Sequence, residues 1–202
     1  MTPLPPLGEA LPRRGSALLR TTGRGVLRLL GWRVEGEIPG LPKLVIAVAP
    51  HTSNWDFVIG VAAMFALDLR LSFLGKHTLF RGPFGAVFRW MGGIPVDRSS
   101  PQGVVAQSVR AFATCERRVL AIAPQGTRKG SGRFRTGFLH IARGAGVPVL
   151  LVALDYGARR VRLGPLLQPG EQVEADLARI EAHFSTVRGR RARRIEAASG
   201  DL

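Results

Sequence analysis

Short apolar runs rich in branched residues alternate along this chain with longer segments of helical length, and no other feature constrains the fold as strongly. The run Leu44–Ala49, bounded by Pro42 and Pro50, is typical of a strand buried on both faces of a parallel sheet. Further strand-like runs are Leu71–Leu74, Val119–Ala123 and Pro148–Leu154, and helical patterns cover Phe57–Leu67, Val104–Cys115, Thr136–Ala145 and Gly170–Phe184. We therefore expect an α/β fold, with a mostly parallel central sheet flanked by helices.

Composition agrees with one folded domain. The chain has 202 residues, of which 46% are hydrophobic and 21% charged, so it can bury a sizeable core without disulfides or metals. We expect a lead-in over residues 1–33, a main domain over 34–187 with a late hairpin around Gly157, and a basic tail over 188–202. The single cysteine, Cys115, excludes an internal disulfide, and together with the lack of a recognisable export signal it favours the cytoplasm.

The chain is strongly basic. Lys and Arg number 29 against 14 Asp and Glu, a formal net charge of +15, and nearly all of it is arginine. Such a charge favours polyanionic partners, which are nucleic acid, anionic lipid headgroups or phosphorylated small molecules. The longest apolar run, Phe57–Leu67, is shorter than the roughly 18–20 residues that a membrane span needs.

Two basic segments flank the main domain. Arg13–Trp32 is amphipathic and is an interfacial helix on anionic lipid, an ordinary first helix packed on the domain, or both at once. Gly23 and Gly25 weaken it as a helix. Arg188–Arg194 holds five arginines in seven residues and is either a solvated end or a contact for anionic lipid or nucleic acid.

The most informative local pattern is His51 with Asp56, where a buried strand ends and a helix begins. If the chain turns between them, Asp56 can accept the proton-bearing nitrogen of His51 and leave the other ring nitrogen as a general base. Backbone N–H groups after Pro50 would then face an oxyanion. The alternative is that Asp56 completes a capping box with Ser53 and that His51 only ends the strand.

Two glycine-containing basic blocks also follow predicted strands. Gly75–Gly85 carries Lys76 and Arg81, and the block from Pro124 onward carries Arg128. Glycine lets a backbone approach a phosphate closely, and arginine binds it with a bidentate fork, so both blocks are candidate phosphate sites. The alternative is that they are turns with solvent-exposed cations.

In order and context these blocks resemble the motifs of the 1-acyl-sn-glycerol-3-phosphate acyltransferase family of glycerolipid acyltransferases. The resemblance runs from Trp32 to Tyr156, and its four motifs are His51 with Asp56, Gly75–Gly85, Pro124–Arg128 and Gly146–Val149. It implies transfer of a fatty acyl group from acyl-CoA or acyl-carrier protein to a hydroxyl of a lysophospholipid or 1-acyl-glycerol-3-phosphate.

The resemblance also implies roles for individual residues. The expected catalytic pair is His51 and Asp56, and the expected substrate-binding residues are Lys76, Arg81, Gln125, Gly126, Thr127 and Arg128. No metal or cofactor is expected. We expect a peripheral protein on the anionic inner face of the cell membrane, with no nucleic-acid partner, because the chain lacks nucleic-acid-binding motifs. Phe80, Phe84, Phe88 and Trp90 either line an acyl tunnel or form a plain apolar face.

One position departs from the family pattern. The third motif usually carries glutamate where this chain has Gln125, so a carboxylate is replaced by a neutral amide with one acceptor oxygen. Together with the net charge of +15 and the arginine-rich tail, this leaves open a second interpretation, a catalytically weak or inactive lipid-binding protein on the membrane. A basic nucleic-acid-binding protein is a less favoured alternative, and a hydrolase in which His51 activates water is another.

Overall fold

A seven-stranded sheet forms the centre of the protein in a computed structural model, which describes residues 4–96, 101–126 and 134–191. The strands are β1 (Arg33–Gly36), β2 (Lys43–Ala49), β3 (Ser72–Lys76), β4 (Gly93–Val96), β5 (Arg118–Ile122), β6 (Val149–Asp155) and β7 (Arg160–Leu167). Their order is β1-β7-β6-β2-β5-β3-β4, and only the β6–β7 pair is antiparallel. The predicted mostly parallel sheet and the late hairpin are confirmed.

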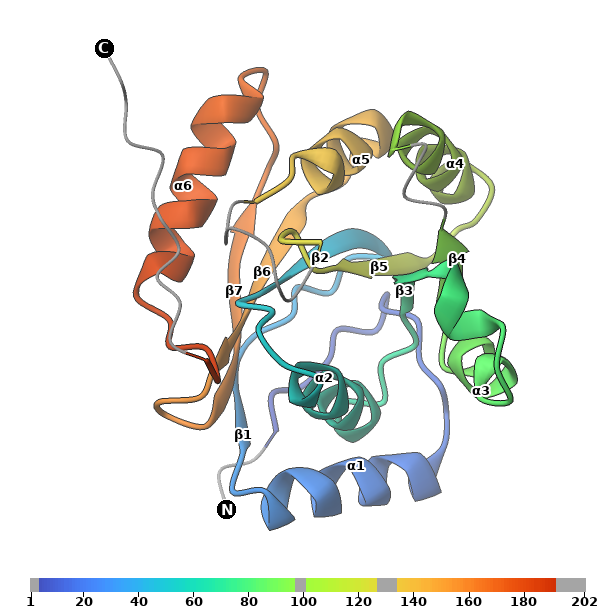
Figure 1. The fold of residues 1–202 in the computed structure, drawn as a ribbon, viewed down its shortest axis with the longest axis vertical. Coiled ribbons are helices and arrows are strands. Elements are labelled where there is room, and N and C mark those ends of the chain that lie inside the picture. The colour runs from blue at the N-terminus through green and yellow to red at the C-terminus, as the bar shows by residue number, and fades with distance from the viewer. Residues whose placement is uncertain (1–3, 97–100, 127–133, 192–202) are drawn as a thin grey trace.

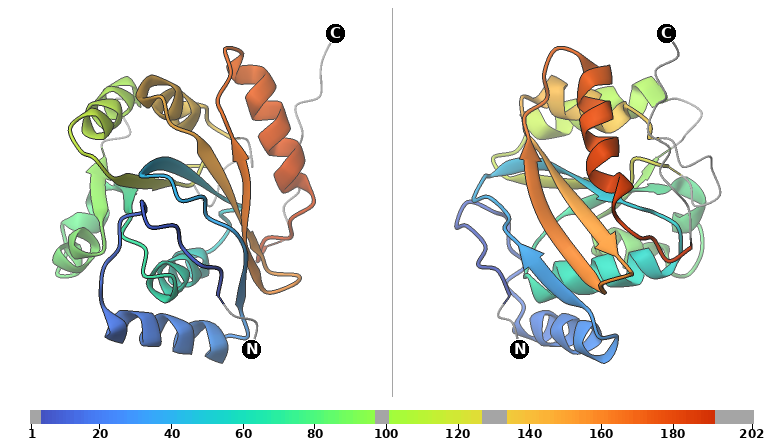
Figure 2. Two further views of the ribbon diagram at one scale, coloured as in Figure 1. Left: turned by 180° about the vertical axis from the view of Figure 1, so that it is seen from behind. Right: turned by 90° about the vertical axis from the view of Figure 1, so that its left-hand side faces the viewer.

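Helices cover both faces of this sheet (Figures 1 and 2). Helices α1 (Ala17–Leu29) and α2 (Trp55–Ala66) lie on one face, and α4 (Pro101–Ala113), α5 (Gly137–Ala145) and α6 (Val173–Ser185) lie on the other. Strand β2 shows why: Leu44 and Ile46 pack toward α2, whereas Val45 and Ala47 pack toward α5. The continuous apolar run of β2 therefore forms a strand that is buried on both faces, as the sequence predicts.

The structure adds elements that the sequence pattern did not indicate. These are the short strands β1 and β4, the 3-10 turn η1 (His77–Phe80) and the short helix α3 (Gly85–Trp90). Strand β4 contains Pro95 and lies at the edge of the sheet, where a missing N–H is tolerated. Elements this short show too little periodicity to be recognised from sequence.

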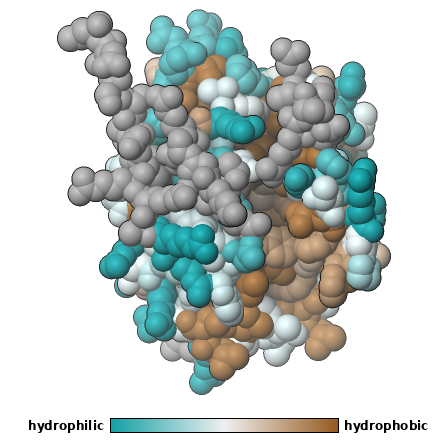
Figure 3. Space-filling view, viewed as in Figure 1, coloured by the Kyte–Doolittle hydropathy of each residue, from teal (hydrophilic) through white to brown (hydrophobic). Residues whose placement is uncertain are grey.

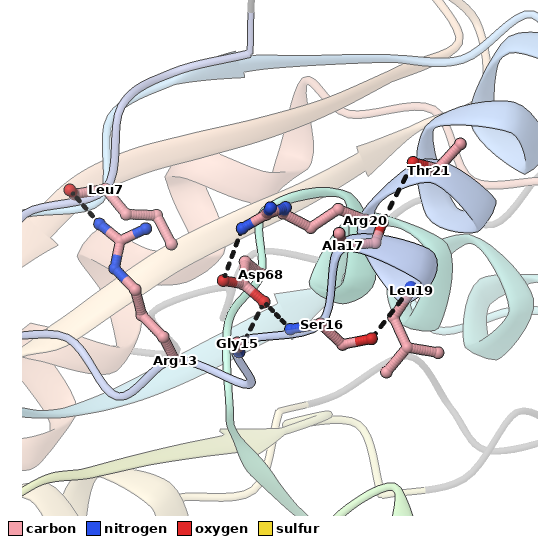
Figure 4. A network of polar contacts seen from close by, with 9 residues as sticks. All are labelled: Leu7, Arg13, Gly15, Ser16, Ala17, Leu19, Arg20, Thr21 and Asp68. Atoms are coloured by element: carbon pink, nitrogen blue, oxygen red, sulfur yellow. Dashed lines mark hydrogen bonds and ion pairs between the residues drawn. The ribbon is translucent and has the colours of Figure 1, made fainter.

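Helix α1 packs directly against α2. The carboxylate of Asp68, just beyond α2, accepts hydrogen bonds from the backbone N–H groups of Gly15 (3.0 Å) and Ser16 (3.4 Å) and from the Arg20 guanidinium (3.3 Å; Figure 4). At Gly23 a Cβ would lie 2.5 Å from the backbone nitrogen of Ala66, so glycine permits the close approach. The interpretation of a packed first helix is therefore right, and the helix is continuous across both of its glycines.

Candidate active site

The turn between β2 and α2 brings His51 and Asp56 together. His51 Nδ1 lies 3.3 Å from Asp56 Oδ2, and the Asp56 side chain is almost completely buried whereas that of His51 is one quarter exposed. With the proton on Nδ1 facing the carboxylate, Nε2 is the ring nitrogen that can accept a proton. The chain does turn before the helix begins, which is the condition that the spacing required.

Asp56 also organises the turn itself. Its Oδ2 accepts hydrogen bonds from the backbone N–H groups of Thr52 (2.6 Å) and Ser53 (2.7 Å), and its Oδ1 accepts one from the Tyr156 hydroxyl (2.6 Å). Burial alone would raise the pKa of Asp56, but hydrogen bonds from His51, Tyr156 and Ser53 outweigh it and hold the pKa below its ordinary value. The carboxylate is therefore ionised at neutral pH, and its capping role and its contact with His51 coexist.

The backbone amides after Pro50 are committed to holding this turn. The His51 N–H donates to the Gln125 side chain, and the N–H groups of Thr52 and Ser53 donate to Asp56. These three N–H groups therefore have acceptors within the protein, and the expectation that N–H groups at the start of the helix stabilise an oxyanion stays a prediction.

Tyr156 is a site residue that sequence reasoning missed. It follows β6, the neighbour of β2 in the sheet, and its ring meets Trp32 edge-on with the centroids 4.8 Å apart. Burial and the hydrogen bond to Asp56 raise the pKa of Tyr156, so its hydroxyl stays a donor. The available signal was its position, immediately after a buried strand that was predicted to lie parallel to β2.

Gln125 holds the candidate catalytic turn from the adjacent strand end. It is buried just beyond β5, and its Oε1 accepts the hydrogen bond from His51 N at 2.5 Å. An amide oxygen supplies this acceptor as well as a carboxylate does. Gly126, next to it, has a φ of +64° and lies under the Arg135 side chain. Thr127 and Arg128 lie outside the described residues.

The second block forms a basic hollow at the carboxyl end of β3. Lys76 ends β3 and is exposed, and Arg81 follows η1. A hollow of about 370 Å³ is lined by His77, Phe80, Arg81, Arg89 and Pro95. Sequence reasoning missed Arg89, whose guanidinium lies over the Phe80 ring at 5.5 Å. Within the described residues neither Arg81 nor Arg89 has a carboxylate partner, so the described lining of the hollow is positively charged.

Exposed apolar side chains lie on α2 and on the segments that line this hollow. They are Trp55 and Val58 of α2, Leu79 of η1, Phe84 just before α3, and Val87 and Trp90 of α3. We call them the apolar face; Figure 3 shows apolar surface gathered at the lower right, where Figure 1 places α3 and the near end of α2. Phe84 and Trp90 are 68% and 58% exposed whereas Phe80 is buried, so the four aromatic residues of this block do not line one enclosed tunnel. No helix among the described residues has the length and apolar character to cross a membrane.

Cys115 lies far from this site. Cys115 precedes strand β5 and Gln125 follows it, so the two residues lie beyond opposite ends of this strand. Its thiol contacts the Ala111 carbonyl oxygen (3.1 Å) and accepts a hydrogen bond from Arg118 (3.2 Å). These contacts fit a structural thiol. In the part of the chain that is described, no three His, Cys, Asp or Glu side chains are grouped so as to hold a metal ion.

The beginning of the basic tail packs beside the candidate catalytic turn. The Tyr156 N–H donates to the Arg188 carbonyl oxygen (2.8 Å), and the Arg191 N–H donates to Thr52 Oγ1 (3.4 Å). The Arg190 guanidinium lies 5.1 Å over the Trp55 ring. The described part of this segment is therefore in contact with the domain.

Comparison with known proteins agrees with the motif series. A family model described as Acyltransferase matches residues 34–155. The chain is 31% identical over 149 residues to the 1-acyl-sn-glycerol-3-phosphate acyltransferase of Escherichia coli (strain K12) and 29% identical over 145 residues to that of Haemophilus influenzae. These matches cover 68% and 67% of this chain, but only 59% of the length of each relative.

The fold is similar to a solved structure. The 1-acyl-sn-glycerophosphate acyltransferase PlsC from Thermotoga maritima superposes with a TM-score of 0.58 at 17% identity, covering 82% of this chain and 75% of that one. The family model spans more than half of the chain and contains His51, Asp56 and Gln125. The predicted resemblance to glycerolipid acyltransferases is confirmed, and the chain belongs to the acyltransferase family.

Proposed function

We propose that this protein transfers a fatty acyl group from a thioester donor, acyl-CoA or acyl-carrier protein, to a hydroxyl of 1-acyl-glycerol-3-phosphate or a related lysophospholipid. The observation that carries the proposal is the contact between His51 Nδ1 and the buried, ionised carboxylate of Asp56. It supports a general base in a chain whose family transfers acyl groups.

In the proposed reaction His51 Nε2 accepts the proton of the acceptor hydroxyl while that oxygen attacks the thioester carbonyl carbon. Asp56 stabilises the imidazolium that forms, and Tyr156 keeps the carboxylate in place through its hydrogen bond. The new C–O bond gives the ester, the C–S bond breaks, and the leaving thiolate takes the proton back from His51. No covalent acyl-enzyme is involved, which agrees with the distance of Cys115 from the turn.

We place the acceptor phosphate against Arg81, with Lys76 and Arg89 in support. Their guanidinium and ammonium groups suit a phosphate, and the apolar face beside the hollow suits an acyl chain. Arg128, Thr127 and Gly126 remain proposed contacts from the third motif. Gln125 acts in this account by holding His51 rather than by binding substrate.

We further propose that the apolar face and the basic surface hold the protein peripherally on the anionic inner face of the cell membrane. Leu18 and Leu29, on the outer side of α1, are 77% and 86% exposed and add to the apolar surface. A lysophospholipid acceptor resides in a bilayer, so an enzyme that uses it gains from attachment there.

Product formation from labelled acyl-CoA and acyl-carrier protein, tested with a panel of lysophospholipids, examines this function directly. Arg81→Ala should raise the KM for the acceptor about tenfold, since a charged contact to phosphate is lost, and should change kcat less. The matched control is Arg110→Ala, an exposed arginine on α4. An unchanged KM removes Arg81 from the acceptor site, and the absence of product with every pair refutes the transferase proposal.

A further inference from the structure

A second basic hollow is lined in part by Tyr156, the residue whose hydroxyl binds Asp56. It has a volume of about 460 Å³ and lies between the β6–β7 turn and the start of the basic tail. Its lining residues include Trp32, Tyr156, Arg159, Arg188 and Arg190. It shares no residue with the hollow around Arg81.

The three arginines of this hollow have no carboxylate partner among the residues that the structure describes. Neighbouring carboxylates are occupied: Asp155 binds Arg162 and the N–H groups that follow it in the turn, and Glu35 binds Arg160 at 2.9 Å. Three guanidiniums without a described carboxylate partner, one of them also over the Trp55 ring, suit a ligand with several anionic groups.

The backbone that carries these arginines is held in place by the candidate catalytic turn. The carbonyl of Arg188 accepts the Tyr156 N–H, and Gly189 is buried so tightly that a Cβ would lie 3.0 Å from Thr52 and 3.1 Å from Pro50. The N–H of Arg191 binds Thr52 Oγ1. Arg188 and Arg190 therefore leave from a backbone that is fixed against the turn that holds His51.

Tyr156 connects the hollow to the catalytic pair. Tyr156 is one of the residues that line the hollow, and its hydroxyl donates to Asp56, so the same residue borders the hollow and contacts the dyad. The proposed reaction has two substrates, and the hollow at Arg81 beside the apolar face accounts for the lipid acceptor. We infer that the hollow of Arg159, Arg188 and Arg190 binds the phosphate groups of acyl-CoA, the thioester donor. This assignment rests on the proposed function.

Binding of CoA, the product that the donor leaves behind, tests the assignment without turnover. Calorimetric titrations compare CoA with pantetheine, which has no phosphate, on the native chain, on Arg159→Asn/Arg188→Gln and on the control Arg110→Gln/Arg117→Gln. Asparagine is chosen because residue 159 has a φ of +52°, which asparagine tolerates. The control removes the same charge from exposed positions near α4.

We expect the native chain and the control to bind CoA equally, and the Arg159/Arg188 variant to bind it about tenfold or more weakly, with pantetheine weak throughout. Equal CoA affinity in the Arg159/Arg188 variant overturns the assignment, as does native affinity for pantetheine equal to that for CoA. The same variant is also tested for sedimentation with anionic vesicles and for binding of acyl-carrier protein. If it loses binding only to the vesicles, the hollow is a lipid headgroup site and the assignment is overturned. If it loses binding only to acyl-carrier protein, the assignment is overturned as well.

The outcome is separable from that of the proposed function. Arginine-dependent CoA binding by a chain that acylates no acceptor would leave the hollow assigned and the transferase proposal refuted. Acyl transfer by a chain whose CoA affinity does not depend on these arginines would support the transferase proposal and refute the assignment of the hollow.

Discussion

Asp56 meets three demands with one carboxylate. It closes the turn by accepting two backbone N–H groups, it faces the ring nitrogen of His51, and it accepts the hydroxyl of Tyr156. An ionised carboxylate has about four lone-pair sites and can satisfy all of these donors, which an amide cannot. The geometry of the base and the shape of the turn therefore depend on the same residue.

The titration of Tyr156 reports this arrangement. The chain contains a single tyrosine, so tyrosinate absorbance measures that residue alone. Burial and the hydrogen bond to Asp56 raise its pKa, so the folded protein should form tyrosinate at higher pH than the urea-unfolded chain, whose tyrosine titrates near pH 10. The stability that this bond contributes is then complete below about pH 10 and is lost as the pH rises through the folded pKa.

Asp56→Asn is the matched variant for that titration. Without the negative charge, the tyrosinate transition of the folded protein should move down toward the ordinary value. A native transition that coincides with that of the unfolded chain would show that Tyr156 does not donate to a buried carboxylate.

The side chain of Gln125 is expected to act through its acceptor oxygen, so the negative charge of the family's usual glutamate is not needed. Gln125→Ala leaves the His51 N–H without its acceptor and should destabilise the fold by about 1–3 kcal/mol, with a clear loss of transfer rate. Gln125→Glu keeps an acceptor oxygen at the same place and should retain activity within a few-fold of the native chain. Denaturation midpoints and kcat check both. A Gln125→Glu chain that is active where the native chain is inactive would show that the amide had abolished catalysis.

At the scale of elements, the packing of α1 on α2 is the contact that sequence reasoning left undecided. Amphipathic arginine-rich helices pack on a domain or lie on a lipid surface, and their periodicity is the same in both cases. Asp68 and Gly23 establish the packing, and a local pattern could not show it because they join residues about 40 to 50 positions apart along the chain. The outer side of α1, with Leu18 and Leu29, stays exposed.

Gly23 and Gly25 make a matched pair within α1. A methyl group at residue 23 would meet the backbone of Ala62 and Ala66, so Gly23→Ala should lower the free energy of unfolding by about 1–3 kcal/mol. At residue 25 nothing lies within 4 Å, so Gly25→Ala should raise it by about 0.5–1 kcal/mol through helix propensity. Urea denaturation measures both values. Equal effects of the two substitutions would contradict the packing of α1 on α2.

Elements with long patterns were predictable and short ones were not. The seven-residue strand β2 and the helices α2, α4, α5 and α6 follow apolar patterns longer than a turn, and each was expected close to its observed bounds. Strands β1 and β4 have four residues each and contain Arg33, Glu35 or Pro95, which individually disfavour a buried strand. Their pairing with β7 and β3 gives them their conformation, and pairing is not visible locally.

The whole molecule presents different surfaces around the catalytic pair. The apolar face and the Arg81 hollow lie toward α3, whereas the second hollow lies toward the hairpin and the start of the basic tail. His51 and Asp56 were found from sequence because they share one turn. Tyr156 was not found, since it reaches Asp56 across 100 residues and no local motif records such a contact. Arg188 was noted only as part of the basic tail and not for its place beside the turn.

Attachment to membranes should depend on the apolar face. Phe84→Ser removes a side chain that is 68% exposed on this face, and it should weaken binding to anionic vesicles about tenfold at high salt, where charge is screened. The control is Leu166→Ser, which removes an exposed apolar side chain from β7. Vesicle sedimentation measures the difference, and equal losses in both variants would place the lipid contact elsewhere.

The central claim is that His51, oriented by Asp56, is the base of an acyl transfer without a covalent intermediate. The most direct measurement is the rate of acyl transfer to 1-acyl-glycerol-3-phosphate by His51→Ala and by Cys115→Ala, with folding of each variant verified by circular dichroism. The account predicts that His51→Ala loses about 10²–10⁴ of the rate, as expected for a general base, while Cys115→Ala keeps it. A folded His51→Ala protein with native activity, or a Cys115→Ala protein without any, would contradict it.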